Sequence, residues 1–372
     1  MVPIKNAGNA VKAILCVQRQ MDVLAAARRT YVRKVYLIML FLAVFVTFGQ
    51  ALYLKKVLLE PLKRVIAEAG RFAAENVRPK RKLAEVISNR DEIGMLAWAI
   101  DRMEDQVVNY VENLTKVTAE KERIGTELAL ATRIQAGMLP NLFPAFPDRE
   151  EFDIYATMDP AKEVGGDFYD FFLIDHDHLG MVIADVSGKG VPAALFMMAS
   201  KILLYNYSIS GRKPSEILAE VNAQICAHEH EDMFVTVWLG ILDLSTGKLT
   251  AANAGHEYPV LREAGGNFAF VKDKHGFVLG GMENMRYQDY ELQLSPGARL
   301  FLYTDGVTEA ENKDVELFGM ERLLAALNRK PDGTPREILD EVHAEVSAFV
   351  GDAPQFDDLT MMCLQYNGRE TA

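Results

Sequence analysis

Cysteine is scarce in this chain of 372 residues. Cys16, Cys226 and Cys363 lie far apart and form no Cys-x-x-Cys pair, which argues against a disulfide framework or a structural zinc site and favours a reducing compartment. Internal repeats and low-complexity tracts are also missing. With 49% hydrophobic and 25% charged residues, the remaining composition is typical of a globular protein with two or three modules.

Acidic residues are rare at the start of the chain and abundant afterwards. Residues 1–82 contain 16 Lys and Arg against 4 Asp and Glu, a net charge of +12, whereas the remainder contains 24 against 48, a net charge of −24. This asymmetry predicts a membrane-proximal N-terminal region and a remainder that does not bind nucleic acid.

Charge is absent altogether from Val35 to Leu54, a run of 20 residues. A helix of this length crosses a hydrocarbon core of about 30 Å, and Tyr36 and Tyr53 suit the two membrane interfaces. The run starts late and no small-residue cleavage site follows it, which argues against a signal peptide. We therefore predict an N-terminal basic segment at residues 1–34 and a transmembrane helix at residues 35–54. Basic residues flank both ends, so the side occupied by residues 1–34 stays open.

Two amphipathic helical patterns follow the apolar run. Glu60-Pro61 comes soon after it, a polar connector intervenes, and Asp91-Glu92 and Gly94 open the second pattern. This arrangement resembles a HAMP domain at residues 55–108. The resemblance implies parallel helix pairs that dimerise into a four-helix bundle and relay a signal; a generic helical linker is the alternative.

The helical pattern then continues without a stop signal until Pro140. Its spacings of three and four residues indicate a seam of the coiled-coil kind, with one break in the repeat near Ala131. We predict a connecting coiled-coil helix at residues 109–139 that dimerises; a single helix packed on the next domain is the alternative. The seam residues are Tyr110, Leu114, Val117, Lys121, Ile124, Leu128, Ala131, Ile134 and Met138.

Beyond Pro140 the pattern changes to short β-like runs separated by turn residues, with helical runs grouped between them. This pattern predicts an α+β domain built on antiparallel sheet at residues 140–368. Expected strands are 152–157, 168–174, 180–184, 234–242, 249–252, 300–303 and 359–365, and expected helices are 192–209, 214–228, 320–327 and 335–350.

Four aspartates stand at the ends of expected strands. Asp185 and Asp305 follow strands, whereas Asp167 and Asp357 precede them. In antiparallel sheet the exit of one strand lies beside the entrance of its neighbour, so the four carboxylates are expected to converge. Converging carboxylates repel one another, and hard divalent cations such as Mg²⁺ or Mn²⁺ relieve that repulsion. Two such ions can activate a water for displacement at phosphorus.

The motifs around these aspartates occur in one order: "VGGDFYDFF", "ADVSGKGVPAALFM", "NAGHEYP", "LYTDGVTEAEN", "LFG" and "FDDLT". Over residues 140–366 the series resembles the metal-dependent serine/threonine phosphatases of the type 2C superfamily, in the SpoIIE/RsbU-like bacterial branch. The resemblance implies an α-β-β-α sandwich of two antiparallel sheets flanked by helices, two Mn²⁺ or Mg²⁺ ions, and a metal-activated water as the nucleophile.

The resemblance also implies roles for single residues. Asp185 would bridge both ions, and Asp358 is the alternative to Asp357 as the last ligand. Relatives in eukaryotes hold the substrate phosphate with an arginine before the first motif; here Lys162 is the only cation nearby, and a solvated surface lysine is the plain alternative. The implied metal ligands are Asp167, Asp185, the carbonyl of Val186, Asp305 and Asp357.

The glycines around Lys189 invite a different interpretation, a nucleotide-binding loop. A Walker loop needs glycine where Ile183 stands and a hydroxyl residue where Gly190 stands. The segment is therefore expected to turn the chain after Asp185 and to launch the helix that follows.

By resemblance, the expected protein is a homodimeric, single-pass inner-membrane phosphatase with a cytoplasmic catalytic domain. Its expected substrate is phosphoserine or phosphothreonine on an anti-sigma-factor antagonist of the STAS type, in a partner-switching circuit. A further hypothesis is that movement of the connecting helix shifts the helix after Gly190 and completes the metal site. The alternatives are a non-catalytic HAMP-linked adaptor and another output enzyme such as a nucleotide cyclase.

Overall fold

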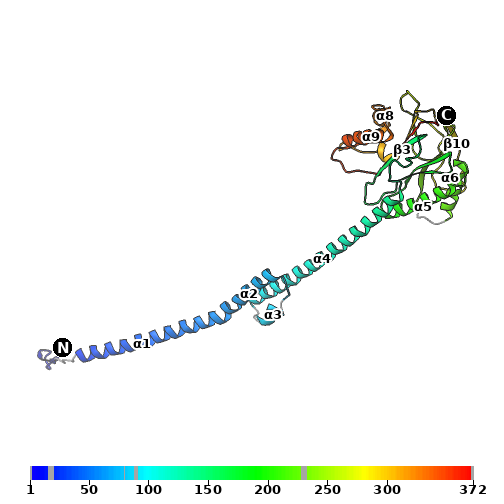
Figure 1. The fold of residues 1–372 in the computed structure, drawn as a ribbon. Coiled ribbons are helices and arrows are strands. Elements are labelled where there is room, and N and C mark those ends of the chain that lie inside the picture. The colour runs from blue at the N-terminus through cyan, green and yellow to red at the C-terminus, as the bar shows by residue number, and fades with distance from the viewer. Residues whose placement is uncertain (1, 16–20, 79, 88–90, 228–232, 370–372) are drawn as a thin grey trace. The chain divides into compact units, whose positions relative to one another are not determined.

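The computed structural model describes residues 2–15, 21–78, 80–87, 91–227 and 233–369. It divides into two compact units, Met1–Lys121 and Glu122–Ala372 (Figure 1). The first unit contains a β-hairpin and helices. Its elements are β1 (Val2–Lys5), β2 (Val11–Leu15), α1 (Met21–Leu54), η1 (Lys55–Leu59), α2 (Glu60–Glu75), α3 (Leu83–Val86) and the first part of α4 (Glu92–Met138).

The apolar run predicted to span a membrane lies in α1. Helical backbone continues from α1 through the π-helical turn η1 into α2, and this helix is long and apolar enough to cross a membrane by length and composition. None of its apolar window is buried. Pro61 does not end the helix; it lies just after the π-helical turn η1, a local widening of the kind that accompanies irregularities in a helix.

The helices after the apolar run form a small core of their own. Val65 of α2, Leu83 of α3 and Ala97 of α4 are buried together with Ile87. The carboxylate of Asp101 accepts the backbone N–H groups of Leu83 and of Ala84, at 2.8 and 2.7 Å, and so caps the start of α3.

The second unit is built on two five-stranded sheets. The first has the order β10-β7-β6-β5-β4 and the second the order β3-β12-β11-β8-β9, and every pairing is antiparallel. The strands of the first are β4 (Phe168–Leu173), β5 (His178–Val186), β6 (Val235–Asp243), β7 (Lys248–Ala254) and β10 (Asp289–Gln293). Those of the second are β3 (Phe152–Asp159), β8 (Val260–Arg262), β9 (Ala269–Phe270), β11 (Arg299–Tyr303) and β12 (Leu359–Tyr366).

Helices cover the outer faces of both sheets (Figure 1). The pair α5 (Val191–Ser208) and α6 (Pro214–Cys226) packs on the first sheet, and α9 (Pro335–Val350), with α8 (Gly319–Leu327), packs on the second. The short helix α7 (Asp305–Thr308) follows β11 directly. Burial of apolar side chains such as Trp238 between these layers supplies the main stabilisation. The predicted α-β-β-α sandwich is confirmed.

Every strand and helix expected from the sequence beyond Pro140 is present, with ends shifted by one or two residues where described. The expected end of α6 at His228 lies outside the described residues. Strands β8, β9 and β10 were not expected, because they are short and only half-buried apart from Val260 and Arg262.

Candidate active site

The four aspartates lie at one end of the two sheets. In the first sheet Phe168 pairs with Ala184, so Asp167 stands opposite Asp185. In the second sheet Tyr303 pairs with Met361, which sets Asp305 and Asp357 just beyond that end of the ladder. The registers of the antiparallel strands therefore place the exit of one strand beside the entrance of the next, as predicted.

A hydroxyl joins the two sheets at this point. Thr304, fully buried at the end of β11, donates a hydrogen bond from Oγ1 to Asp167 Oδ2 at 2.7 Å. The Thr304 backbone N–H donates to the carbonyl of Thr360 on β12 at 3.0 Å. Asp167 is thus held by the opposite sheet, which fixes the distance between the carboxylates of the two sheets.

Burial and mutual repulsion raise the pKa of three of these carboxyl groups. Asp167 is 2% exposed, and its pKa is raised well above the usual range by burial and then by the charges of Asp185 and Asp358. Burial, with the charge of Asp305 next, raises the pKa of Asp185. For Asp305 the same causes, burial and the nearby charge of Glu309, raise the pKa to about 6. The site therefore concentrates negative charge that favours a cation.

The adjacent residues Asp357 and Asp358 do different things. Both oxygens of Asp358 accept backbone hydrogen bonds, Oδ1 from Ala161 at 2.8 Å and Oδ2 from Gly166 at 2.7 Å. Asp357 instead forms an ion pair with Lys189, with 2.9 Å between Oδ2 and Nζ. Asp358 is therefore an anchor for the loop before Asp167, while Asp357 keeps a carboxylate that can exchange its partner.

Lys189 is the cation held against the acidic cluster. Besides Asp357, its Nζ donates to the carbonyl of Phe356 at 2.6 Å and lies 4.2 Å from the centre of the Phe356 ring. Gly188 and Gly190 on either side have φ of 91° and 85°, a region that favours glycine. Lys162, by contrast, is exposed, and among the described residues no ion pair or hydrogen bond involves its side chain.

Glycines bring the backbone close to the acidic residues. A Cβ on Gly306 would lie 2.0 Å from the carbonyl oxygen of Asp358, and a Cβ on Gly166 would lie 3.0 Å from that of Val186. Only glycine fits at Gly306, because a contact that short with backbone cannot be relieved by a side-chain movement. The Val186 carbonyl, implied as a ligand by resemblance, lies against this glycine-lined segment.

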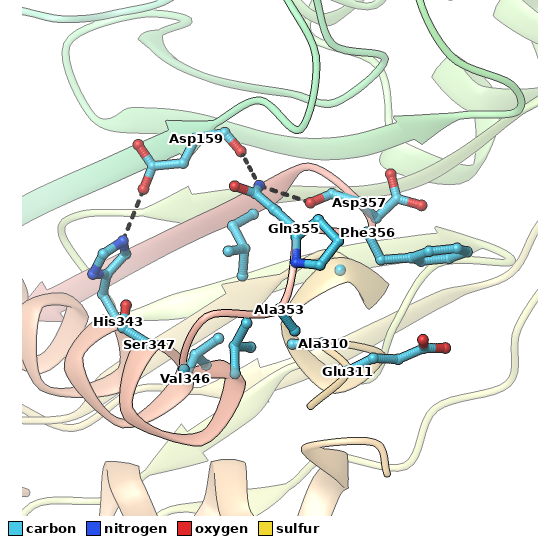
Figure 2. A pocket seen from close by; sticks show the side chains of 15 residues that line it. Asp159, Ala310, Glu311, His343, Val346, Ser347, Ala353, Gln355, Phe356 and Asp357 are labelled. Atoms are coloured by element: carbon cyan, nitrogen blue, oxygen red, sulfur yellow. Dashed lines mark hydrogen bonds and ion pairs between the residues drawn. The ribbon is translucent and has the colours of Figure 1, made fainter. Parts of the chain in front are cut away.

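A cavity of about 450 Å³ opens beside Asp357. Figure 2 shows Gln355 spanning its upper edge, where its amide donates to the carbonyls of Asp159 and Asp357, both at 2.8 Å. His343 of α9 pairs with the Asp159 carboxylate at 3.1 Å, and Phe356, 54% exposed, lies at the end near Asp357. The cavity mixes apolar and polar lining next to the acidic cluster.

The histidines stand apart from the acidic cluster or are buried in the fold. His256 is 3% exposed, contacts the Thr236 hydroxyl through Nδ1 at 2.8 Å, and has its pKa lowered to about 3 by burial. His176 and His178 pair with neighbouring aspartates at the surface. His228 and His230 lie outside the described residues.

The donor chemistry of the cluster fits a hard divalent cation, because every candidate ligand is an oxygen. Within the described part of the chain, no three acidic, histidine or cysteine side chains are already arranged around one point that could hold an ion. Instead, the Asp167 carboxylate accepts a hydrogen bond from Thr304. The Asp357 carboxylate forms an ion pair with Lys189. A cation bound by Asp357 would have to replace the Lys189 contact.

Three features of the site were missed from the sequence: the Thr304 bridge, the Lys189 pair and the anchoring role of Asp358. The signal for Thr304 was available, since it directly precedes Asp305 at the expected strand exit. The other two depend on which way side chains of one loop face another, and no periodicity in the sequence encodes that.

Comparison with solved structures defines the class of the fold. The SiaA-PP2C domain of Pseudomonas aeruginosa superposes with a TM-score of 0.60 at 24% identity, covering 67% of this chain and 99% of that domain. The PP2C phosphatase domain of SpoIIE from Bacillus subtilis, with a fragment of its regulatory domain, gives 0.52 at 20% identity, covering 59% and 64%. The second unit therefore has the fold of a PP2C phosphatase domain.

Sequence comparison gives the family. The model for Stage II sporulation protein E (SpoIIE) matches residues 175–367, about half of the chain. Protein IcfG of Synechocystis sp. is 33% identical over 75% of this chain and 47% of its own length, so the chain spans about half of that relative. Phosphoserine phosphatase RsbU of Bacillus subtilis is 30% identical over 63% of this chain and 69% of its own. The chain belongs to the SpoIIE family.

Proposed function

We propose that this protein is a metal-dependent protein serine/threonine phosphatase whose active site is the acidic cluster. The observation that carries the proposal is the meeting of Asp167, Asp185, Asp305 and Asp357 at one end of two sheets, with raised pKa values at three of them. Such clustering of perturbed carboxyl groups is typical of a catalytic site. The name phosphoserine phosphatase, carried by the relatives RsbU and RsbP of Bacillus subtilis, supports the same activity.

Two Mn²⁺ or Mg²⁺ ions would be held by the four aspartates and the Val186 carbonyl. When bound, the ions supply activation of a water and neutralisation of charge at phosphorus. Thr304 keeps Asp167 oriented during the reaction, and Asp185 stands opposite Asp167 in the first sheet. Release of Asp357 from Lys189 leaves an ammonium beside the site. We therefore assign phosphate binding to Lys189 and no longer to the exposed Lys162.

The proposed substrate is phosphoserine or phosphothreonine on a STAS-type anti-sigma-factor antagonist, within a partner-switching circuit. The support is the resemblance of the motifs to the SpoIIE/RsbU-like branch and the names of the relatives. The cavity beside Asp357 has room for residues that flank the phosphorylated side chain.

The proposed architecture keeps the divisions expected from the sequence: a basic segment, residues 1–34; a transmembrane helix, 35–54; a HAMP domain, 55–108; a connecting helix, 109–139; and the phosphatase domain, 140–368. The apolar helix supports one membrane span; the inner membrane and a catalytic domain in the cytoplasm are proposed from the family resemblance. The exposed seam side chains Leu114, Val117, Ile124 and Ile134 support a homodimer through the connecting helix.

The test uses the full chain in detergent micelles with a phosphoserine peptide and Mn²⁺. We expect phosphate release that EDTA abolishes. Asp185→Asn should lower kcat/KM by more than about 100-fold, since partners one step outside a metal's ligands already cost 10–100-fold. Asp148→Asn, an exposed change of the same charge, is the control and should keep full activity. Full activity of Asp185→Asn, or activity that survives EDTA, would refute the assignment.

A further inference from the structure

The segment between β3 and β4 carries Asp167 and has no regular secondary structure of its own. Residues 160–167 form bends and irregular backbone only. Their backbone groups therefore need partners from elsewhere in the fold. On one side Asp358 supplies two of them, accepting from Ala161 and Gly166.

The partner on the other side is Gln135, on the last turns of α4. Its Nε2 donates to the carbonyl of Gly165 at 2.7 Å, and its Oε1 accepts from the N–H of the same residue at 3.2 Å. One turn earlier the hydroxyl of Thr132 donates to the carbonyl of Glu163. Side chains at the end of α4 thus hydrogen-bond to the main chain of the segment that carries Asp167.

Gln135 is buried on a helix that is otherwise mostly exposed. Its side chain is 5% exposed, and Leu139 is the next fully buried residue, while Leu130 and Ile134 are 49% and 53% exposed. Residues 132 and 135 share one face of the helix, because they are three positions apart, and Leu139 follows one residue beyond the end of α4. α4 therefore meets the domain through this face, with a glutamine at its centre where an apolar side chain would suffice for packing.

Gly165 is tightly packed within this segment. A Cβ on Gly165 would lie 2.4 Å from Asp358 Oδ2 and 2.5 Å from Met158 Cε. Gly165 is thus wedged between Asp358 and Gln135. A shift of Gly165 caused by either neighbour would therefore displace Gly166 and Asp167, the next two residues of the chain.

We propose that Gln135 is a positioning residue that couples the rotational setting of α4 to the geometry of the acidic cluster. The break in the seam near Ala131 marks the place where the setting can change. A helix drifts about 20° per heptad relative to a strict heptad seam, and the end of a side chain about 6 Å from the axis then moves about 2 Å. That movement exceeds what either hydrogen bond to Gly165 tolerates.

This inference rests on the proposed metal site, and it stands beside the hypothesis that movement of the connecting helix shifts the helix after Gly190 and completes the metal site. Gln135 reaches Asp167 through two residues of backbone. α5 begins at Val191, beyond Lys189 and the two glycines of positive φ beside it.

The experiment compares Gln135→Leu with Arg133→Ala, an exposed change on the same turn, both in the full chain in detergent micelles. Two measurements need no substrate: hydrogen exchange of the peptide spanning Gly165 to Asp167, and calorimetric titration with Mn²⁺ alone. Gln135→Leu should speed exchange there by about tenfold and raise the Kd for Mn²⁺ by about tenfold, the equivalent of one lost hydrogen-bond pair at about 1.4 kcal/mol. Arg133→Ala should change neither.

Thr132→Val is the second variant, and it decides the question if Gln135→Leu does not fold. It removes one hydrogen bond to the segment, and both measurements should change by about threefold in the same direction. A purely structural role would lower the Tm and leave Mn²⁺ binding unchanged, which would overturn the inference. If the unchanged chain bound Mn²⁺ but released no phosphate, the proposed function would fail, and the two measurements would still decide the role of Gln135.

Discussion

The acidic cluster predicts that one inactivating substitution stabilises the metal-free protein. Asp305→Asn removes a carboxylate that lies near the charges of Glu309, Asp357 and Glu257. The amide has nearly the same shape, so packing at the start of α7 is preserved. Activity should be lost with the ligand, while the free energy of unfolding without metal should rise.

The size of the gain follows from the pKa. Burial and the neighbouring carboxylates raise the pKa of Asp305 from 3.8 to about 6, and each pH unit is worth about 1.4 kcal/mol, so full ionisation costs about 3 kcal/mol. The side chain is partly exposed, and solvent screening reduces this cost to about 2 kcal/mol. For a domain of this size, such a gain raises the Tm by roughly 4–8 °C.

The sign of the pH dependence follows from linkage. The folded pKa lies above the unfolded one, so the wild type loses stability as pH rises from 3.8 to about 6, and the full cost is present above that. The advantage of Asp305→Asn should therefore be complete at pH 8 and mostly gone at pH 4.5.

The assay is thermal unfolding of the full chain in EDTA at the two pH values, with Asp148→Asn as the exposed control. Added Mn²⁺ should raise the Tm of the wild type and leave that of Asp305→Asn unchanged, because a ligand stabilises only the state that binds it. If Asp305→Asn raised the Tm equally at both pH values, or did not raise it at pH 8, repulsion between carboxylates at this site would not destabilise the metal-free protein.

Two further substitutions test the cations around the site. Lys189→Ala should lower the Kd for Mn²⁺ about fivefold in calorimetry, because the half-exposed pair with Asp357, worth about 1 kcal/mol, no longer competes; weaker binding would mean that the lysine helps to hold the metal site together. Lys201→Ala leaves the buried Asp170 without its partner, and breaking such a pair costs about 3 kcal/mol. Burial raises the pKa of Asp170, so the loss of Tm should shrink as the pH falls and the carboxylate takes up a proton; a loss independent of pH would assign the effect to packing alone.

The part of the site that the sequence predicted is the part set by strand alternation. Asp167, Asp185, Asp305 and Asp357 stand at strand ends, and antiparallel pairing brings exits beside entrances whatever the loops do. The same strand pattern predicted an α+β domain with antiparallel sheet, whereas the α-β-β-α sandwich was implied by the resemblance of the motifs. Short edge strands such as β9 could not be predicted, because two residues are too few to show an alternation of apolar and polar side chains.

The part that could not be predicted depends on loops that face one another. Asp357 and Asp358 are adjacent and chemically identical, so only the surrounding backbone decides that Asp358 accepts N–H groups while Asp357 pairs with Lys189. Gln135 was invisible for a related reason. Its partner lies 30 positions away in a segment without a pattern.

The two anchors of the Asp167 segment have a consequence for signalling that holds in both directions. If the setting of α4 changes the affinity of the cluster for a cation, then cation binding must favour the docked setting of α4 by the same factor, because the coupling free energy belongs to the pair of sites. Asp358 fixes the segment from within the catalytic domain, whereas Gln135 fixes it from the helix that arrives from the first unit. The segment is therefore the point at which metal occupancy and helix position have to agree, and a tenfold effect at one corresponds to about 1.4 kcal/mol at the other.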